Sequence, residues 1–222
     1  MKSVAAALAV GAAVFVLVAA PARAQVTIGA HAATTGIGPD LQWRLNDQFS
    51  IRGSADWLDF TASRTYNDVH YDGRLKMGTG AAFLDWHPWS NAFFLSGGAY
   101  FGDRRVTLDA TPASNVILGG QSFTPGEVGH LNGAIKMSSA APFAGLGVDS
   151  SAASSARGLG FKGVIGVAFS GKPSVNLTSS NGALSGSGVL QQALESEQAN
   201  IANKASFLQY YPVVQAGVTY KF

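Results

Sequence analysis

The chain has 222 residues, of which 13% are charged and 47% are hydrophobic, with a formal net charge of +2 and no cysteine. The lack of cysteine excludes a disulfide framework and a thiol nucleophile. The small excess of positive charge argues against a nucleic-acid-binding protein, which would carry a strongly basic patch. We therefore expect no nucleic acid among the partners of this protein.

The first 24 residues predict a cleaved secretory signal peptide. Lys2 supplies a short positive region, residues 5–20 form a nearly unbroken apolar run, and Ala22-Arg23-Ala24 has the small-x-small pattern that precedes cleavage. The run is shorter than the roughly 20 residues that a transmembrane helix needs. Cleavage after Ala24 would leave 13 basic and 13 acidic residues in a single domain over residues 25–222.

The rest of the chain predicts strands rather than helical membrane spans. No later stretch holds 18 consecutive apolar residues. Apolar and polar residues alternate with a period of two, most clearly over 48–58, where Phe49, Ile51, Ala55 and Trp57 share one face. A literal count gives ten strands, or eight if 142–149 or 173–179 is not separate. The ten are 26–34, 37–45, 48–58, 69–86, 91–108, 128–137, 142–149, 158–170, 173–179 and 211–222.

The connections between these strands predict the two sides of a barrel. On the ten-strand count, short turns at Asn46, Pro88, Ser138 and Lys172 fall on the periplasmic side. The longer loops at 59–68, 109–127, 150–157 and 180–210 then fall outside. The alternation breaks near residues 103–105, which predicts a β-bulge or the membrane edge there. Residues 189–208 carry leucine and isoleucine at spacings of four and seven, which predicts one amphipathic helix.

The last predicted strand, 211–222, ends on an aromatic residue. Its apolar alternate set is Pro212, Val214, Ala216, Val218, Tyr220 and Phe222. In this strand the chain resembles bacterial outer-membrane β-barrel proteins, whose final strand ends in an aromatic-x-Phe pattern, and in general style it resembles the small OmpA- and OmpW-type barrels. The resemblance implies that Tyr220 and Phe222 form an assembly signal read by the barrel-assembly machinery. It also implies outer-membrane lipid as a partner and the outer membrane as the location.

These observations predict an all-β fold: a closed antiparallel transmembrane β-barrel of 8–10 strands with one short amphipathic helix before the last strand. A closed barrel is required because each backbone N–H and C=O must find a partner away from water. Aromatic rings near strand ends are expected to form girdles at the membrane boundary. These residues are Trp43, Trp57, Trp86, Trp89 and Tyr211.

A barrel of this size has an interior that its own side chains can fill. We expect a charge network inside it, in which opposite charges are paired because unpaired buried charges are costly. The expected members are Asp40, Arg44, Arg52, Asp56, Asp72, Arg74, Lys76, Lys136 and Lys162. The alternative is a narrow channel for small solutes, weakly anion-preferring because bases outnumber acids in this set.

The expected function is therefore a structural or interaction role in the outer membrane. No enzyme, metal site or cofactor is expected, since the four histidines are scattered and no Gly-x-Ser-x-Gly elbow occurs. Two further alternatives are an outer-membrane lipid-modifying enzyme and a soluble lipocalin-like binder, which would turn its apolar faces inward around a ligand. The sequence leaves the oligomeric state open.

Overall fold

The computed structural model describes residues 25–66, 69–154 and 156–222, so the expected signal peptide lies outside the described residues. Eight antiparallel strands close into a barrel through the pairing of β5 with β9, which confirms the predicted fold class with eight wall strands instead of ten. These strands are β1 (Gln25–Ala33), β2 (Gly36–Arg44), β3 (Phe49–Tyr66), β4 (Val69–Trp86), β5 (Phe93–Thr111), β9 (Ala140–Asp149), β10 (Gly158–Phe169) and β12 (Tyr210–Lys221).

Two further strands, β8 (His130–Lys136) and β11 (Ser174–Ser180), continue the lines of β9 and β10. Arg105 pairs with Lys136 and Phe101 pairs with Ala140, so β8 and β9 keep one register along β5. The predicted turn at Ser138 is therefore an interruption within a wall strand, and the turn at Lys172 is a second one. The ten-strand count was wrong because a break in alternation looks like a turn when the partner strand is unknown.

The two ends of the barrel differ. One end, here called the turn end, holds Gln25, Lys221 and the connections 45–48, 87–92 and 150–157. The last of these contains α2 (Ser150–Ala153), and Lys221 Nζ donates a hydrogen bond to the Ser151 carbonyl at 3.2 Å. The sequence placed 150–157 on the outer side. That assignment was wrong because β8 and β9 run in the same direction, so the connection after β9 is at the turn end.

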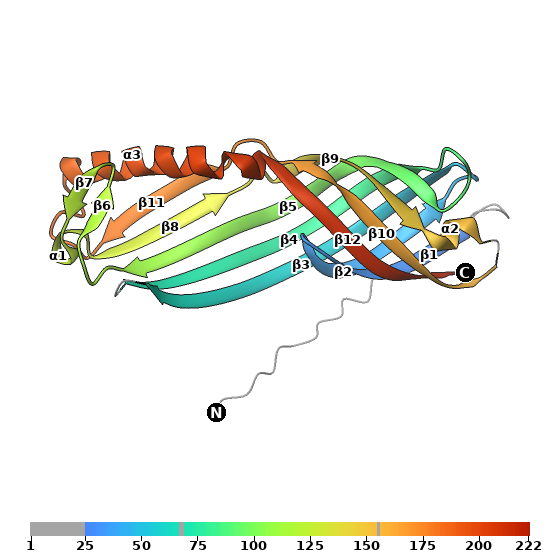
Figure 1. The fold of residues 1–222 in the computed structure, drawn as a ribbon, viewed down its shortest axis with the longest axis horizontal. Helices are drawn as coiled ribbons and strands as arrows, with labels where there is room; N and C mark the ends of the chain where they lie inside the picture. Colours follow the sequence, from blue (N-terminus) through green and yellow to red (C-terminus); the bar gives the residue numbers. More distant parts are fainter. Residues whose placement is uncertain (1–24, 67–68, 155) are drawn as a thin grey trace, which may run out of the picture.

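At the opposite end, five strands continue past the barrel as an open sheet, here called the extension (Figure 1). It consists of β8, β11 and the outer parts of β3, β4 and β5. A small apolar core joins it to α3 (Gly188–Lys204), the hairpin β6 (Val116–Leu118) and β7 (Gln121–Phe123), and α1 (Pro125–Val128). The short helix η1 (Ala205–Gln209) follows α3 and leads into β12. The predicted helix over 189–208 is thus confirmed, and the Ser187 side chain caps its N-terminus. No helix among the described residues is long and apolar enough to span a membrane.

The outward face of the barrel wall is apolar. On β3, β4 and β5 the outward positions run over nine residues each, Phe49–Trp57, Trp86–Gly78 and Phe93–Phe101, with small or apolar side chains at every second position. Nine residues span about 27 Å along a strand, or about 21 Å along the membrane normal at a 40° tilt. This height is close to the roughly 25 Å apolar band of transmembrane barrels.

The polarity of the two faces is reversed in the extension. Its outer face, in line with the apolar face of the wall, is polar. Its inner face, in line with the polar barrel interior, carries Leu58, Phe60, Leu75, Met77, Val106, Leu108, Leu131, Ile135, Val175 and Leu177. The reversal occurs around residue 102 on β5, while β5 pairs with β4 without interruption. The reversal therefore coincides with the predicted break in alternation near residues 103–105, and the pairing of β4 with β5 contains no β-bulge there.

Candidate functional site

The barrel interior contains the largest group of buried polar side chains, and its first cluster is built around His31 of β1. His31 Nε2 lies 2.7 Å from Asp56 Oδ1, and Nδ1 lies 3.3 Å from Asp40 Oδ2. The Thr35 hydroxyl donates to the second oxygen of Asp56 at 2.7 Å. Space for the imidazole comes from Gly217 of β12, where a Cβ would lie 2.7 Å from His31 Cβ. The cluster ties β1, β2, β3 and the β1–β2 turn together.

A second cluster links β3, β4 and β5. The Arg52 guanidinium donates two hydrogen bonds to the Asp85 carboxylate, at 2.8 and 3.2 Å, and one to the Ser96 hydroxyl at 3.1 Å. Ser96 in turn donates to Asp85 at 2.6 Å. Arg52 also lies over the Phe83 ring, 4.2 Å from its centroid. Arginine binds a carboxylate most strongly through two parallel hydrogen bonds, and it also stacks on aromatic rings. This cluster should therefore hold three adjacent strands in register.

A third cluster crosses the interior from β10. Lys162 Nζ donates to Gln42 Oε1 and lies 3.5 Å from Asp40 and 3.6 Å from Asp149. Because Asp40 also contacts His31, this lysine joins the cluster around His31 to β10. Asp149 accepts hydrogen bonds from the backbone and hydroxyl of Ser151, the second residue of α2.

Towards the extension the interior is aromatic. Phe83, Tyr100 and Phe143 pack edge to face, with ring centroids 5.2–5.6 Å apart. Beyond them Arg104 is buried and donates to the Ser170 hydroxyl at 2.8 Å and to the Ser138 carbonyl at 2.6 Å. Both acceptors lie at the interruptions between β9 and β8 and between β10 and β11. Arg104 therefore satisfies backbone and side-chain groups that the wall leaves unpaired there.

The side chains of these clusters are buried in the barrel interior. The buried aspartates among the described residues equal the buried lysines and arginines in number, and the eight residues are Asp40, Asp56, Asp85, Asp149, Arg52, Arg104, Lys162 and Lys221; His31 is buried as well, between Asp40 and Asp56. A void of about 10 Å³ remains near the turn end, beside Gln42, Arg44 and Lys221. That volume is about enough for one water molecule. Among the described residues no group of three or more His, Cys, Asp or Glu side chains could hold a metal ion.

A further buried histidine lies at the turn end. His87, in the connection between β4 and β5, contacts the Asn91 carbonyl through Nδ1 at 3.0 Å and packs against Phe94. Burial lowers the pKa of His87 below its ordinary value. The imidazole is therefore neutral at physiological pH and adds no charge at the turn end.

The predicted charge network is only partly inside the barrel. Asp40, Arg52, Asp56 and Lys162 are buried in the interior, and Arg44 lies at its turn end. The other four expected members, Asp72, Arg74, Lys76 and Lys136, lie on the outer face of the extension, so their lumenal placement was wrong. On β4 the odd-numbered residues form an apolar alternate set that looks outward-facing in sequence, whereas Met77 and Phe83 are buried inside the barrel and Leu84 and Trp86 face outward.

Several interior residues were missed by the sequence reasoning. Asp85, Arg104, Asp149 and Lys221 are buried charges that it did not single out. Asp85 was concealed by the same face error on β4. Lys221 could have been predicted from the sequence. It belongs to the mixed, mostly polar or small alternate set of the last strand, and so it lies on the face opposite to that of Phe222.

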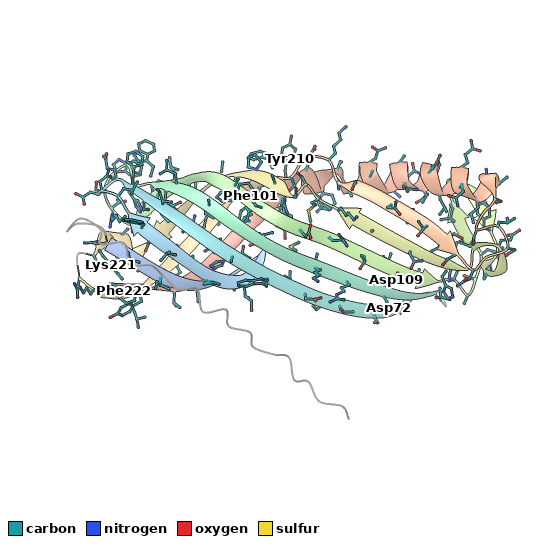
Figure 2. All side chains as sticks on the ribbon, turned by 180° about the vertical axis from the view of Figure 1, so that it is seen from behind. Asp72, Phe101, Asp109, Tyr210, Lys221 and Phe222 are labelled. Carbon is teal, nitrogen blue, oxygen red and sulfur yellow. The ribbon has the colours of Figure 1, made fainter. Side chains whose placement is uncertain are left out.

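The aromatic residues lie near both ends of the wall. Trp43, Trp86 and Trp89 are exposed near the turn end, and Trp57 is 58% exposed at the opposite end of the apolar band. Tyr211 was wrongly expected in the girdle: it faces inward, and its hydroxyl donates to the Thr34 carbonyl at 2.7 Å. Its neighbour Tyr210 takes the outward position, and Figure 2 shows Tyr210 and Phe101 at the border of the extension.

The proposed assembly residues lie together at the turn end. Tyr220 and Phe222 both face outward, and their rings meet edge to face at 4.9 Å. The Phe222 N–H donates to the Val26 carbonyl at 3.1 Å, which continues the pairing of β12 with β1 to the last residue (Figure 2). The terminal aromatic pair therefore lies on the barrel seam that joins the first and last strands.

Comparison with known proteins supports the fold. No protein-family model matches the chain, and no curated protein is significantly similar to it in sequence. The crystal structure of CarO from Acinetobacter baumannii is similar, with a TM-score of 0.61, 23% identity, and coverage of 89% of this chain and 98% of that one. The crystal structure of CarO2 from the same organism gives a TM-score of 0.60 and 22% identity over the same coverage. At these identities the similarity concerns the fold of the barrel alone.

Proposed function

We propose that this protein is an outer-membrane β-barrel protein with a structural or interaction role, whose interior is filled by polar side chains. The observation that carries the proposal is the reversal of face polarity at the end of the apolar band. Lipid accounts for an apolar outer face around a polar interior, and water accounts for the opposite arrangement in the extension. A lipocalin-like binder would have apolar side chains throughout its interior, which the clusters around His31 and Arg52 do not allow.

We further propose that the extension projects from the cell. In bacterial barrels the short turns are periplasmic and the longer segments are external. The connections at 45–48 and 87–92 are short, whereas the extension carries the hairpin, α1 and α3. Its polar outer face then belongs to the cell surface, which suits an interaction role.

Fractionation of cells tests the location. The protein is expected in the outer-membrane fraction, and unboiled samples are expected to migrate faster on gels than boiled ones because the closed barrel resists detergent. A soluble periplasmic protein without a heat shift would overturn the proposal, and a search for a bound ligand would then follow.

Conductance measurement tests the filled interior. Purified protein in planar bilayers is expected to show no steady ion current, because buried and paired side chains of β2 and β10, and of β3 and β5, contact each other inside the barrel. The folded state of the same preparation is checked by its heat-shifted band. Reproducible channel events from folded protein would favour the channel, and an anion preference would support the form expected from the sequence.

Deletion of Phe222 tests the assembly signal. The variant is expected to lose most of its outer-membrane insertion, because the deletion removes the exposed terminal ring and its backbone hydrogen bond to β1. The measurement is the heat-shifted fraction in isolated membranes. Phe207→Ala is the matched control, since Phe207 is an exposed phenylalanine in η1, outside the barrel wall. Normal insertion of the deletion variant would refute the assigned role.

A further inference from the structure

Three basic residues stand side by side on the outer face of the extension. Lys76 of β4 pairs with Arg105 of β5, and Arg105 pairs with Lys136 of β8, so the three occupy one rung across adjacent strands. Cβ atoms of directly opposite residues lie about 4.5–5.5 Å apart in a sheet. We call this set the basic rung. All three side chains are exposed.

The basic rung is poorly compensated by the protein itself. Like charges directly opposite each other destabilise a sheet. No ion pair among the described residues involves any of the three. Asp59 of β3 lies directly opposite Lys76 and attracts it, but its hydrogen bonds come from Arg74, whose Nε donates to it at 2.8 Å. The bond with Arg74, together with the charges of Arg74 and Lys76, lowers the pKa of Asp59.

The other charged groups on this face do not cancel the rung. Asp103 lies one outward position below Arg105 and is the nearest additional acid on β5. Asp72 and Asp109 oppose each other two outward positions above, about 13 Å along the strands, beyond a Debye length of about 8 Å. Figure 2 shows these two aspartates farther out in the extension. The rung and Arg74 supply four bases against Asp59 and Asp103, so the region around the rung stays positive.

The position of the rung identifies the ligand chemistry. On β4 the rung comes directly after the last apolar outward position, Gly78, and on β5 only Asp103 separates it from Phe101. Trp57 pairs with Gly78 on the lipid side of the rung. A Cβ added at Gly78 would meet no atom within 4 Å, so the surface under the rung is open. At this height a transmembrane barrel faces the headgroups of the lipid leaflet.

We propose that Lys76, Arg105 and Lys136 bind phosphate groups of membrane-lipid headgroups in the leaflet next to the extension. The inference rests on the proposed membrane function and adds a specific lipid class to it. Each base offers charged N–H donors to phosphate oxygens, and arginine can bind two of them. The phosphate in turn relieves the repulsion along the rung.

The test compares phosphorylated lipid A with its dephosphorylated form, added to the purified full chain in neutral detergent and counted by native mass spectrometry. A base near an anionic lipid surface contributes about 1 kcal/mol, or about a fivefold change in affinity. Arg105→Gln with Lys136→Gln is therefore expected to weaken binding of the phosphorylated lipid about 25-fold. The matched control is Arg157→Gln with Lys204→Gln, two exposed bases away from the rung that remove the same charge, and its binding is expected to be unchanged.

Three outcomes would overturn the inference. The first is equal binding of both lipid forms by the unaltered chain, and the second is equal loss in the rung and control variants, which would indicate a general charge effect. The third is displacement of the lipid by inorganic phosphate at low concentration, which would identify a site for free anions. Heat-shifted migration is measured on every variant. A folded barrel without phosphate preference refutes the inference alone, whereas a chain that does not enter membranes refutes the proposed function.

Discussion

Arg52→Leu is expected to lower the free energy of unfolding by about 3–5 kcal/mol. The substitution leaves the Asp85 carboxylate buried without its bidentate partner and removes the contact with Phe83. Asp85 has no exposed surface to recover hydration. The measurement is urea unfolding of the barrel in lipid vesicles, followed by tryptophan fluorescence.

Two further variants separate the charge effect from a general loss of packing. Arg157→Leu changes an exposed arginine in the connection before β10 and is expected to shift stability by no more than about 0.5 kcal/mol. Adding Asp85→Leu to Arg52→Leu is expected to recover part of the loss, because the uncompensated charge is then removed as well. Additive losses in the double variant would show that the pair is not coupled and that packing alone accounts for the effect.

Ala82→Arg is expected to destabilise the inserted barrel by about 2–4 kcal/mol. Ala82 lies at the middle of the nine-residue apolar run of β4 and faces outward, so an arginine there would be held near the bilayer midplane. The same unfolding measurement in vesicles gives the value. Insertion yield, measured as the heat-shifted fraction, should fall as well.

Asn132→Arg is the matched control for the membrane-facing substitution. Asn132 is exposed on the same outward side of the sheet but in the extension, opposite Asp109 of β5. The change in stability is expected within about 0.5 kcal/mol, since the new charge is in water. A similar cost at both positions would contradict the assignment of the reversal in polarity to the membrane edge.

The interior clusters and the apolar outer face depend on each other. A small closed barrel has no space for a separate hydrophobic core, so inward side chains must fill the interior and satisfy one another. The network around Asp40 joins β1, β2, β3 and β10 in this way. The extension is an open sheet and has an edge instead. It gains stability because Leu190 and Leu194 of α3 pack with Leu131 and Leu177 of its inner face.

The amino-acid sequence by itself determined the class of fold. Alternation with a period of two in β3 and β12 correctly predicted which residues share the outward face, including Ile51, Trp57 and Val218. It also predicted the interior positions of Asp40, Arg52, Asp56 and Lys162. The helix before the last strand followed from its spacing of leucines. These features depend on local periodicity, which is present in the chain before any partner strand is known.

Only the tertiary structure decided what each apolar face contacts. Leu131 and Ile135 form an apolar alternate set that looks lipid-facing in sequence, yet they line the inner face of the extension. For the same reason Arg74, Lys76 and Lys136 looked lumenal. A period of two distinguishes two faces but does not say which is inside, because lipid and a protein core select the same side chains. The partner strands and α3 make that choice, and they also join ten apparent strands into eight.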